Sequence, residues 1–365
     1  MSTHIPRVMK AVLLTGHGGF DRLEYRDDIP VPTVGRDEVL VRVGAAAINN
    51  TDINTRIGWY SKAVRSSTAE SASEGGSSAS PSDASWSGAP MSFPRIQGAD
   101  CCGYIVDAGE GVDRARIGER VIVRNMLRSY VGYRPFECWT FGSECDGAFA
   151  QYAKAPAAET YKVECDWSDA ELATIPCAYS TAEGMLHRAS VKAGERVLVT
   201  GASGGVGSAA VQLARRRGAR VTAIAARSKI GLMEARGAEL VIAREQNLVD
   251  SLGTEGFNVV IDVVAGPHWP ELLEVLKHGG RYVVAGAIAG PIVQLDVRTL
   301  YLKDLSFFGC TFQDDVVFGN LVRYVERGEI HPNVAKTYPL RDIVKAQEDF
   351  ISKRFAGKIV VIPPP

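Results

Sequence analysis

A glycine-rich turn is the segment of this sequence best suited to bind a phosphate group. It follows a short apolar run and leads into a helical pattern, and its residues are Gly201, Ala202, Ser203, Gly204, Gly205, Val206 and Gly207. Against the pattern G-x-G-x-x-G, alanine replaces the first glycine, whereas Gly204 and Gly207 occupy the second and third positions. The second glycine lets the backbone approach a pyrophosphate, and the third lets the helix pack closely on the strand. Since a helix N-terminus adds free N–H groups and a positive dipole, the turn predicts a dinucleotide site, with a plain glycine-rich turn as the alternative.

The residues after the next apolar strand favour NADP(H) over NAD(H). An NAD-binding protein carries an acidic residue about 20 residues beyond the turn, where it holds the adenosine ribose. Here the strand ends in alanines, and Arg227, Ser228 and Lys229 follow. A carboxylate would repel a 2′-phosphate, whereas these three side chains can bind one. The alternative is that Arg227 and Lys229 are solvated loop charges.

The cysteines and histidines do not have a spacing that predicts a metal site. The 7 cysteines and 6 histidines are scattered along the chain. An odd, scattered set of cysteines argues against a disulfide framework and favours buried thiols. The neighbours Cys101 and Cys102 would face opposite sides of a strand, so at most one of them could join a set of ligands. Ser-His-Asp hydrolysis has no support either, because the sequence contains no G-x-S-x-G motif.

The chain that positions these residues shows two sequence patterns, one in each half. Up to about residue 160, short β-type runs alternate with turns, which predicts an antiparallel, barrel-like domain. From about residue 168, apolar strands alternate with helices, which is typical of a parallel sheet covered on both faces. The predicted fold class is therefore α/β, with a doubly wound parallel sheet of the Rossmann type and a β-rich domain. Residues 61–94 hold 12 serines, so we expect a mobile surface loop there, either a flexible lid or a tolerated insertion.

Length and charge limit the possible functions. The chain has 365 residues, which suggests about two domains. Its 41 Lys and Arg balance 42 Asp and Glu, for a formal net charge of -1, which argues against a nucleic-acid partner. The sequence has no apolar run of about 18 residues, so we expect no membrane span. The first residues also lack the apolar stretch of a signal peptide, so we expect a cytoplasmic protein.

Six motifs, one of them the glycine-rich turn described above, occur in a characteristic order. They are Met9-Lys-Ala-Val, Asn49-x-x-Asp52-x-x-x-Arg56-x-Gly58-x-Tyr60, Gly98-Ala-Asp-x-x-Gly103-x-Ile-Val, Asp146-Gly-Ala-Phe-Ala-Gln-Tyr, Ala202-Ser-Gly-Gly-Val-Gly and Gly357-Lys-Ile-Val. In this order they resemble the medium-chain dehydrogenase/reductase superfamily, and most closely its quinone oxidoreductase branch. The resemblance implies a GroES-like catalytic domain over residues 1–160 and a Rossmann NADP-binding domain over 161–311. Residues 312–365 would return to the catalytic domain, and a homodimer or homotetramer is implied.

The resemblance also allows the zinc ligands to be checked by position. Zinc-dependent members supply a Cys, a His-Glu pair and a second Cys, and a catalytic zinc needs three protein ligands. Here Asn49 replaces the first Cys, Ala99 replaces the His, and only Cys177 fits the last position. The lobe that would hold a structural zinc offers two of the four cysteines required. We therefore expect no metal, while a site improvised from Cys177, Asp100 and a nearby cysteine stays open.

The resemblance implies site residues on both sides of a cleft. Asn49 and Tyr60 stand at substrate-side positions, where each offers a neutral hydrogen-bond donor, and Tyr60 could also deliver a proton. On the cofactor side, Thr181 resembles the family threonine near the nicotinamide ribose. Gly286 stands where the chain should pass the nicotinamide, and Lys358 stands at a cofactor-side position. A purely structural role is the alternative for each of these residues. Asp52 and Arg56 are expected to form a structural pair, or polar contacts near the cofactor, rather than to act as catalysts.

These features predict an NADPH-dependent oxidoreductase that transfers hydride to a quinone or an α,β-unsaturated carbonyl without zinc. Such a small-molecule substrate is already an electrophile. The protein must therefore supply positioning, exclusion of water and a hydrogen-bond donor near the oxygen that gains charge. Two alternatives remain open at this point: a zinc-dependent alcohol dehydrogenase with atypical ligands, and a non-catalytic NADPH-binding protein.

Overall fold

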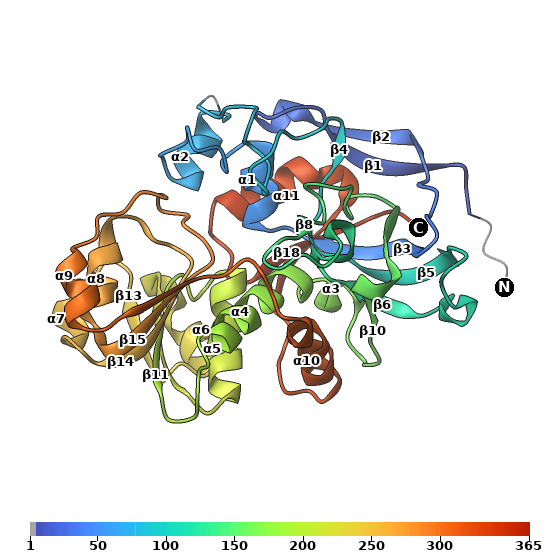
Figure 1. Ribbon diagram of the computed structural model, residues 1–365. Coiled ribbons are helices and arrows are strands. Elements are labelled where there is room, and N and C mark those ends of the chain that lie inside the picture. The colour runs from blue at the N-terminus through green and yellow to red at the C-terminus, as the bar shows by residue number, and fades with distance from the viewer. Residues whose placement is uncertain (1–4, 77) are drawn as a thin grey trace.

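The second half of the chain contains a six-stranded parallel sheet, seen at the lower left of Figure 1. The computed structural model describes residues 5–76 and 78–365. The strand order is β13-β12-β11-β14-β15-β16. These strands are β11 (Arg196–Val199), β12 (Arg220–Ala225), β13 (Leu240–Ala243), β14 (Phe257–Asp262), β15 (Leu276–Val284) and β16 (Ser306–Gly309). The central strand β11 is buried on both faces, because Val197, Leu198 and Val199 are each 0% exposed. The predicted doubly wound sheet is therefore present.

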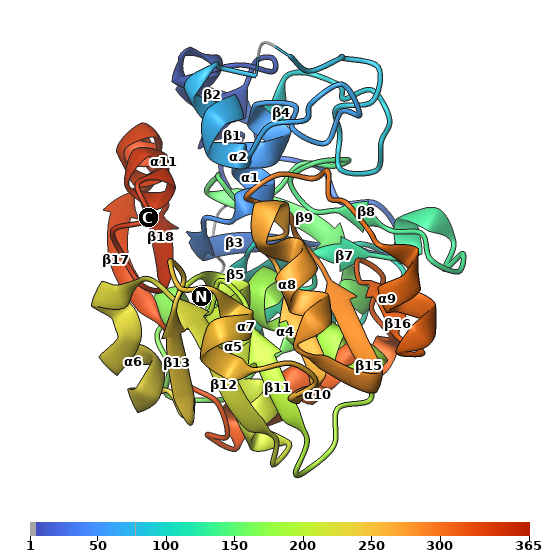
Figure 2. The same ribbon diagram turned by 90° about the vertical axis from the view of Figure 1, so that its left-hand side faces the viewer.

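The first half forms a β-rich lobe, which Figure 2 shows above the parallel sheet. Its main sheet has the order β10-β6-β5-β3-β18-β17, and β9 also pairs with β3. These strands are β3 (Glu38–Ala47), β5 (Cys102–Ala108), β6 (Arg120–Val123), β9 (Tyr152–Pro156), β10 (Thr160–Lys162), β17 (Val334–Pro339) and β18 (Lys358–Ile362). Two smaller sheets are built from β1 (Val8–Leu14), β2 (Leu23–Pro30) and β4 (Arg95–Ile96), and from β7 (Met126–Leu127) and β8 (Trp139–Thr140).

The last strands connect the C-terminal part of the chain to this β-rich lobe. β18 pairs antiparallel with β3, where Val360 lies opposite Ala47 and Val361 opposite Ala46. β17 then adds parallel to β18, so the sheet is mixed rather than entirely antiparallel. The β-rich lobe is therefore built from residues of both halves of the sequence.

Helices cover the two lobes and link them. The link between the lobes includes α4 (Pro176–Arg188), which packs against α5 (Gly205–Arg216) and α10 (Asp315–Glu326). The remaining α-helices are α1 (Asn50–Arg56), α2 (Thr68–Ser73), α3 (Asp169–Leu172), α6 (Ile230–Ala235), α7 (Leu248–Leu252), α8 (Trp269–Glu274), α9 (Val297–Leu302) and α11 (Ile343–Ile351). Short 3-10 turns are η1 (Phe20–Arg22), η2 (Arg114–Arg116), η3 (Ser129–Val131), η4 (Ala157–Glu159), η5 (Arg227–Lys229), η6 (Gly266–His268) and η7 (Leu340–Asp342). Across the described residues, none of the helices has the length and apolar character needed to cross a membrane.

The serine-rich segment 61–94 is more structured than the surface loop expected from its composition. It contains α2, whose start is fixed by a capping box in which Ser67 accepts from the Glu70 N–H and Glu70 accepts from the Ser67 N–H. Val64 and Ala84 are 4% and 0% exposed. Local capping and a few buried side chains therefore give secondary structure to a segment whose composition alone predicts none.

Candidate active site

The glycine-rich turn lies at the N-terminus of α5, as predicted. Gly204 is the N-cap residue and Gly205 begins the helix, so Val206 and its neighbours present their N–H groups at this end. A Cβ built on Gly207 would lie 2.3 Å from the Gly201 carbonyl oxygen. Only glycine fits that position, because the first turn of the helix packs directly on the loop after β11. Ser203 lies in this loop and is partly exposed. The turn can therefore accept a pyrophosphate in the manner expected for a dinucleotide.

The basic residues after β12 are divided between solvent and the protein. The turn η5 holds Arg227, Ser228 and Lys229, and Arg227 and Ser228 are exposed. Lys229 is instead engaged, because its Nζ donates to the carbonyl oxygens of Lys353 at 2.8 Å and Phe355 at 3.0 Å. Burial lowers the pKa of Lys229. Of the three predicted contacts to a 2′-phosphate, the structure leaves Arg227 and Ser228 with exposed side chains.

A further arginine lies at the same edge, which the sequence patterns did not indicate. The backbone N–H of Arg244, just after β13, donates to the Ala225 carbonyl oxygen at the end of β12 at 2.9 Å. The Arg244 side chain is exposed. Its Nε lies 3.2 Å from Glu245 Oε1, which offsets its charge, and the pairing of β12 with β13 brings it to the end of β12.

Asn49, Asp100 and Lys358 form a buried polar cluster opposite the phosphate turn. The Asn49 Nδ2 donates to Asp100 Oδ2 at 2.8 Å and to the Ala47 carbonyl at 3.2 Å. The Lys358 Nζ donates to Asn49 Oδ1 and lies 2.9 Å from Asp100 Oδ2. A Cβ built on Gly205 would lie 3.0 Å from Lys358 Cδ, so the lysine reaches from the β-rich lobe to the start of α5.

The cluster changes the expected role of Asn49. Both N–H groups of its amide are already donated, and its oxygen accepts from Lys358. Asn49 is also the N-cap of α1, where its backbone N–H donates to Asp52 Oδ2 at 2.8 Å. With its donors committed, Asn49 is arranged to hold Lys358 and Asp100 rather than to bind a substrate oxygen.

The donor set around Asp100 does not fit a catalytic zinc. Asp100 Oδ1 accepts the Cys177 N–H at 2.6 Å, and its Oδ2 is taken by Asn49 and Lys358. Burial raises the pKa of the Cys177 thiol, which disfavours the thiolate that a metal needs. Cys101 packs in the core of the β-rich lobe, whereas Cys102 packs against the other lobe, so the two neighbours face opposite ways. Within residues 5–76 and 78–365, no three His, Cys, Asp or Glu side chains gather as a metal site would require.

The structure does not contain the expected structural pair between Asp52 and Arg56, because each side chain has other partners. Asp52 Oδ1 accepts the N–H groups of Gly98 and Ala99, each at 3.2 Å. Arg56 donates instead to the Gly18 carbonyl at 2.7 Å and to the Gln347 side chain at 3.0 Å. The expected pair is wrong because the two side chains leave opposite ends of α1. Burial raises the pKa of Asp52 to about 7, against the effect of the N–H groups it accepts.

Tyr60 lies beside the N-terminal turn of α1. Its hydroxyl donates to Thr51 Oγ1 at 3.1 Å, and its ring packs edge-on against Trp59. Burial raises the pKa of Tyr60, so the phenol stays protonated at neutral pH. A negative charge on Asp52 would raise this pKa further, because Asp52 lies on α1 close to Tyr60.

Thr181 and Gly286 lie on the Rossmann side of the cleft. Thr181 lies one turn beyond Cys177 on α4 and is partly exposed. A Cβ on Gly286 would lie 3.1 Å from the Val263 carbonyl, and a Cβ on Gly201 would lie 3.2 Å from Val263 Cγ2. Gly286 and the phosphate turn thus flank the same residue at the carboxyl edge of the sheet. This is the edge where ligands bind in doubly wound sheets.

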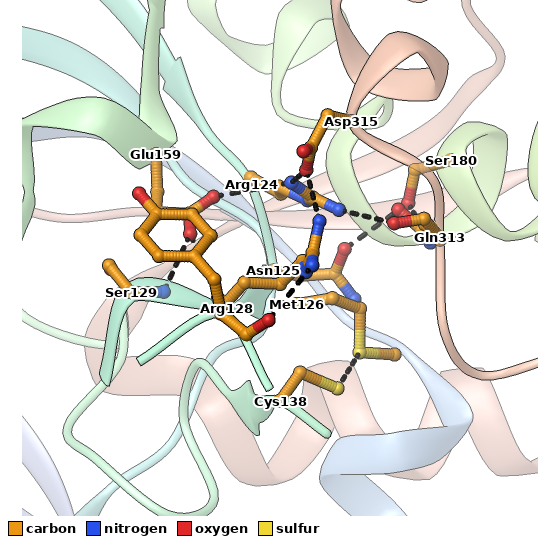
Figure 3. A network of polar contacts seen from close by, with 11 residues as sticks. Arg124, Asn125, Met126, Arg128, Ser129, Cys138, Glu159, Ser180, Gln313 and Asp315 are labelled. Carbon is orange, nitrogen blue, oxygen red and sulfur yellow. Dashed lines mark hydrogen bonds and ion pairs between the residues drawn. The ribbon is translucent and has the colours of Figure 1, made fainter. Parts of the chain in front are cut away.

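A second polar network holds the two lobes together, and no sequence pattern pointed to it (Figure 3). Arg124, whose side chain is 2% exposed, lies between Glu159 and Asp315 at 3.5 and 3.4 Å. Its Nη2 also donates to the Gln313 carbonyl at 2.8 Å. The Gln313 side chain donates to Ser180 Oγ at 2.8 Å, on α4 beside Thr181. The network therefore joins the segment after β6 to the start of α10 and to the helix that carries Thr181.

Comparison with known proteins gives a consistent result over the whole chain. The family model for the alcohol dehydrogenase GroES-like domain matches residues 75–165, and the model for a zinc-binding dehydrogenase matches residues 205–327. The chain is 30% identical to the acryloyl-coenzyme A reductase of Metallosphaera sedula, over 97% of this chain and 99% of that protein. It is 29% identical to the quinone oxidoreductase of Lama guanicoe, over 98% of each chain. A Sinorhizobium meliloti protein of known structure aligns with a TM-score of 0.87 and 44% identity, over 99% of this chain and 98% of that one.

Proposed function

Because the chain belongs to the medium-chain dehydrogenase/reductase superfamily, we propose that it reduces quinones or α,β-unsaturated carbonyls with NADPH and without zinc. Membership makes it an oxidoreductase of this type. Two relatives carry the names quinone oxidoreductase and acryloyl-coenzyme A reductase. A quinone and an acryloyl thioester are both electrophiles that accept hydride without prior ionisation of an alcohol, so these names support an activated substrate.

One observation carries the zinc-free part of the proposal. The position next to Asn49 that a metal would need is occupied by the ammonium group of Lys358, which both Asn49 and Asp100 hold. A cation that is already neutralised by Asp100 leaves that carboxylate unavailable to a second cation. Lys358 also reaches α5 beside Gly205, so the same positive charge lies next to the phosphate turn. With both Asp100 oxygens and the Asn49 oxygen engaged, this arrangement argues against a metal ion between these residues.

Residues of the turn and of the edge after β12 would hold the cofactor. The N–H groups at the start of α5 would bind the pyrophosphate, and Gly204 and Gly207 would permit its approach. The exposed side chains of Arg227 and Ser228 would bind the 2′-phosphate. Thr181, Gly286 and Lys358 would line the rest of the cofactor. When bound, the nicotinamide supplies the reducing equivalent.

The protein's own contribution on the substrate side comes from Tyr60. Its neutral phenol can donate a hydrogen bond to the substrate oxygen as negative charge develops there. In the structure this hydroxyl donates to Thr51 Oγ1 at 3.1 Å, so its O–H would have to turn from Thr51 to the substrate oxygen during turnover. Asn49 acts one step away, by fixing Lys358 and Asp100.

The proposed reaction is tested by NADPH oxidation with a panel of quinones, enones and enoyl thioesters. We expect turnover with at least one class, and Tyr60→Phe should lower kcat about a hundredfold while NADPH still binds. Tyr25→Phe, at an exposed tyrosine on β2, is the matched control and should leave kcat unchanged. Tight NADPH binding without turnover of any class would instead favour the non-catalytic binding protein. About one zinc per purified chain, needed for turnover of an alcohol, would favour the zinc-dependent alternative.

We propose that two copies associate through the outer edge of the parallel sheet. β16 ends the strand order, and an edge strand offers unpaired backbone groups to a symmetric copy. Next to it Val297, Tyr301 and Leu302 are 58%, 59% and 62% exposed. Leu302→Asp should convert the homodimer or homotetramer to a smaller species in light scattering. Val8→Asp, at a residue 50% exposed on β1, should leave the mass unchanged.

The cytoplasm is the proposed compartment. All seven cysteines are free in the structure, three of them only partly buried. Disulfides are uncommon in the reducing cytosol, which agrees with this set of thiols.

A further inference from the structure

The serine-rich segment crosses from the β-rich lobe to the Rossmann lobe at Thr68. Thr68 is the first residue of α2, and its backbone N–H donates to the Ile288 carbonyl oxygen at 3.1 Å. Ile288 follows β15, in the loop that begins near Gly286. Figures 1 and 2 both place α2 directly beside this loop of the Rossmann lobe. The segment therefore contacts the Rossmann lobe at this point.

The side chain of Thr68 makes a contact in the other direction. Its Oγ1 donates to Asn54 Oδ1 at 3.2 Å, on α1, and Thr68 is 7% exposed. The residues just before Thr68 are also held in place, because Trp59 Nε1 donates to the Ser66 carbonyl oxygen at 3.1 Å. Thr68 thus has one hydrogen bond to each side of the cleft.

Both contacts reach residues next to the proposed site. Asn54 lies on α1 together with Thr51, the hydrogen-bond partner of Tyr60, and its carbonyl oxygen accepts from the Trp59 N–H at 2.8 Å. Ile288 lies two residues beyond Gly286, which the proposed function places against the nicotinamide. The bridge through Thr68 therefore connects the proposed proton donor with the proposed cofactor loop.

We propose that Thr68 is a positioning residue that ties these two sides together, an inference that rests on the proposed function. Its side chain fixes Asn54 on α1, the helix whose Thr51 bonds the Tyr60 hydroxyl. Its N–H holds the 286–290 loop to α2, so this loop would have to break the bond in order to move away from a bound cofactor. Thr68 itself lies before residue 75, where the match to the GroES-like family model begins.

A pair of substitutions can separate the two hydrogen bonds. Thr68→Pro removes the N–H, and Thr68→Val keeps it while removing the hydroxyl. Proline is well tolerated at the first position of a helix. Ser67 precedes it with φ -63° and ψ 161°, the extended conformation that a residue before proline adopts. Both variants should therefore fold, and Thr68→Ser, which keeps both groups, is the conservative rescue.

The readout is the rate at which bound NADPH dissociates, followed by its fluorescence, alongside kcat. Thr68→Val should lower kcat without changing the dissociation rate, and Thr68→Ser should restore kcat. Thr68→Pro should lower kcat equally and raise the dissociation rate about fivefold, the effect of one hydrogen bond. Equal dissociation rates in the proline and valine variants would overturn the bridge. An unchanged kcat in Thr68→Val would overturn the role toward Asn54.

Failure of the proposed function gives a different result. If the unaltered protein binds no NADPH, the proposed function fails whatever Thr68 does. The bridge is then tested by hydrogen exchange in the segment 286–290 of the unliganded protein. Faster exchange in Thr68→Pro than in Thr68→Val supports the bridge, and equal exchange overturns it.

Discussion

The ammonium group of Lys358 lies 2.9 Å from the carboxylate of Asp100, and their side chains are 3% and 0% exposed. This ion pair joins β18 to the loop before β5, two segments far apart in the sequence. Asn49 binds both members, so the pair and the amide form one unit. The position of the Lys358 ammonium beside the phosphate turn therefore depends on Asp100, a carboxylate that no sequence pattern linked to this lysine.

Removing one member of this pair should lower the free energy of unfolding more than removing both members. Lys358→Met leaves the Asp100 carboxylate buried without a counter-charge, which costs about 3–5 kcal/mol. Lys358→Met combined with Asp100→Asn removes that charge and should be more stable than Lys358→Met alone. Urea unfolding of the two single variants and the double variant measures the coupling. Additive losses would show that the two residues do not act as a pair.

Arg227 should determine the choice between NADPH and NADH. Its exposed guanidinium can meet a 2′-phosphate, and a hydrogen bond between charged groups is worth enough to change affinity about tenfold or more. Arg227→Ala should therefore reduce the NADPH preference in kcat/KM by about that factor.

Lys229→Met is the matched comparison for Arg227. Its ammonium is bound to two carbonyl groups of the C-terminal segment, so the cofactor preference should change much less. The 2′-phosphate site would be misplaced if Lys229→Met, and not Arg227→Ala, abolished the preference.

The phosphate turn should not tolerate a side chain at Gly207. Gly207→Ala would place a carbon 2.3 Å from the Gly201 carbonyl oxygen, so the loop must move. We expect a loss of about 1–3 kcal/mol in stability and weaker NADPH binding, measured by urea unfolding and fluorescence titration. Gly231→Ala is the control, because nothing lies within 4 Å of its Cβ on α6. There alanine should stabilise by up to about 1 kcal/mol and leave binding unchanged.

Asp52 should make the protein less stable as the pH rises toward neutrality. Its pKa is raised from 3.8 to about 7 in the folded state, so the folded protein holds a proton that the unfolded chain releases. Its contribution to stability is therefore full below pH 4 and is lost as the pH rises through 7. The urea midpoint of the unaltered protein, relative to Asp52→Asn, should fall between pH 5 and pH 8.

Asp250→Asn, at an exposed aspartate of α7, is the control for that comparison and should not alter the pH profile. A constant difference between the unaltered protein and Asp52→Asn from pH 5 to pH 8 would contradict the assignment.

Much of the fold follows from local patterns. The inner strands β11, β12 and β14 lie where apolar runs predict them, since an inner strand of a parallel sheet is buried on both faces, whereas the mostly exposed edge strand β16 was not predicted. The phosphate turn is equally local, because one glycine pattern, one strand and one helix define it. The serine-rich segment departs from its composition because a capping box at Ser67 and Glu70 stabilises a helix of six residues.

The parts of the site that the sequence did not indicate depend on distant pairing. Asp100 drew attention only as a possible metal ligand, since nothing in its neighbourhood reveals Lys358. Lys229 resembled a phosphate ligand, but its length lets it reach carbonyls 124 and 126 residues away. Arg124 and Gln313 meet across the lobes without any motif. The contacts of Asp100, Lys229 and Arg124 depend on side-chain length and on strand order, which no short sequence pattern encodes.

The return of β18 to β3 also sets an order of assembly during synthesis. The parallel sheet is built from one continuous stretch, between Arg196 and Gly309, and can fold as soon as that stretch has left the ribosome. The β-rich lobe is synthesised first, yet it cannot complete its main sheet until Lys358–Ile362 arrives. Until then the edge of β3 and the partners of Lys358 stay open. The nascent chain thus holds a finished nucleotide-binding half beside an unfinished catalytic half, and the active site closes last.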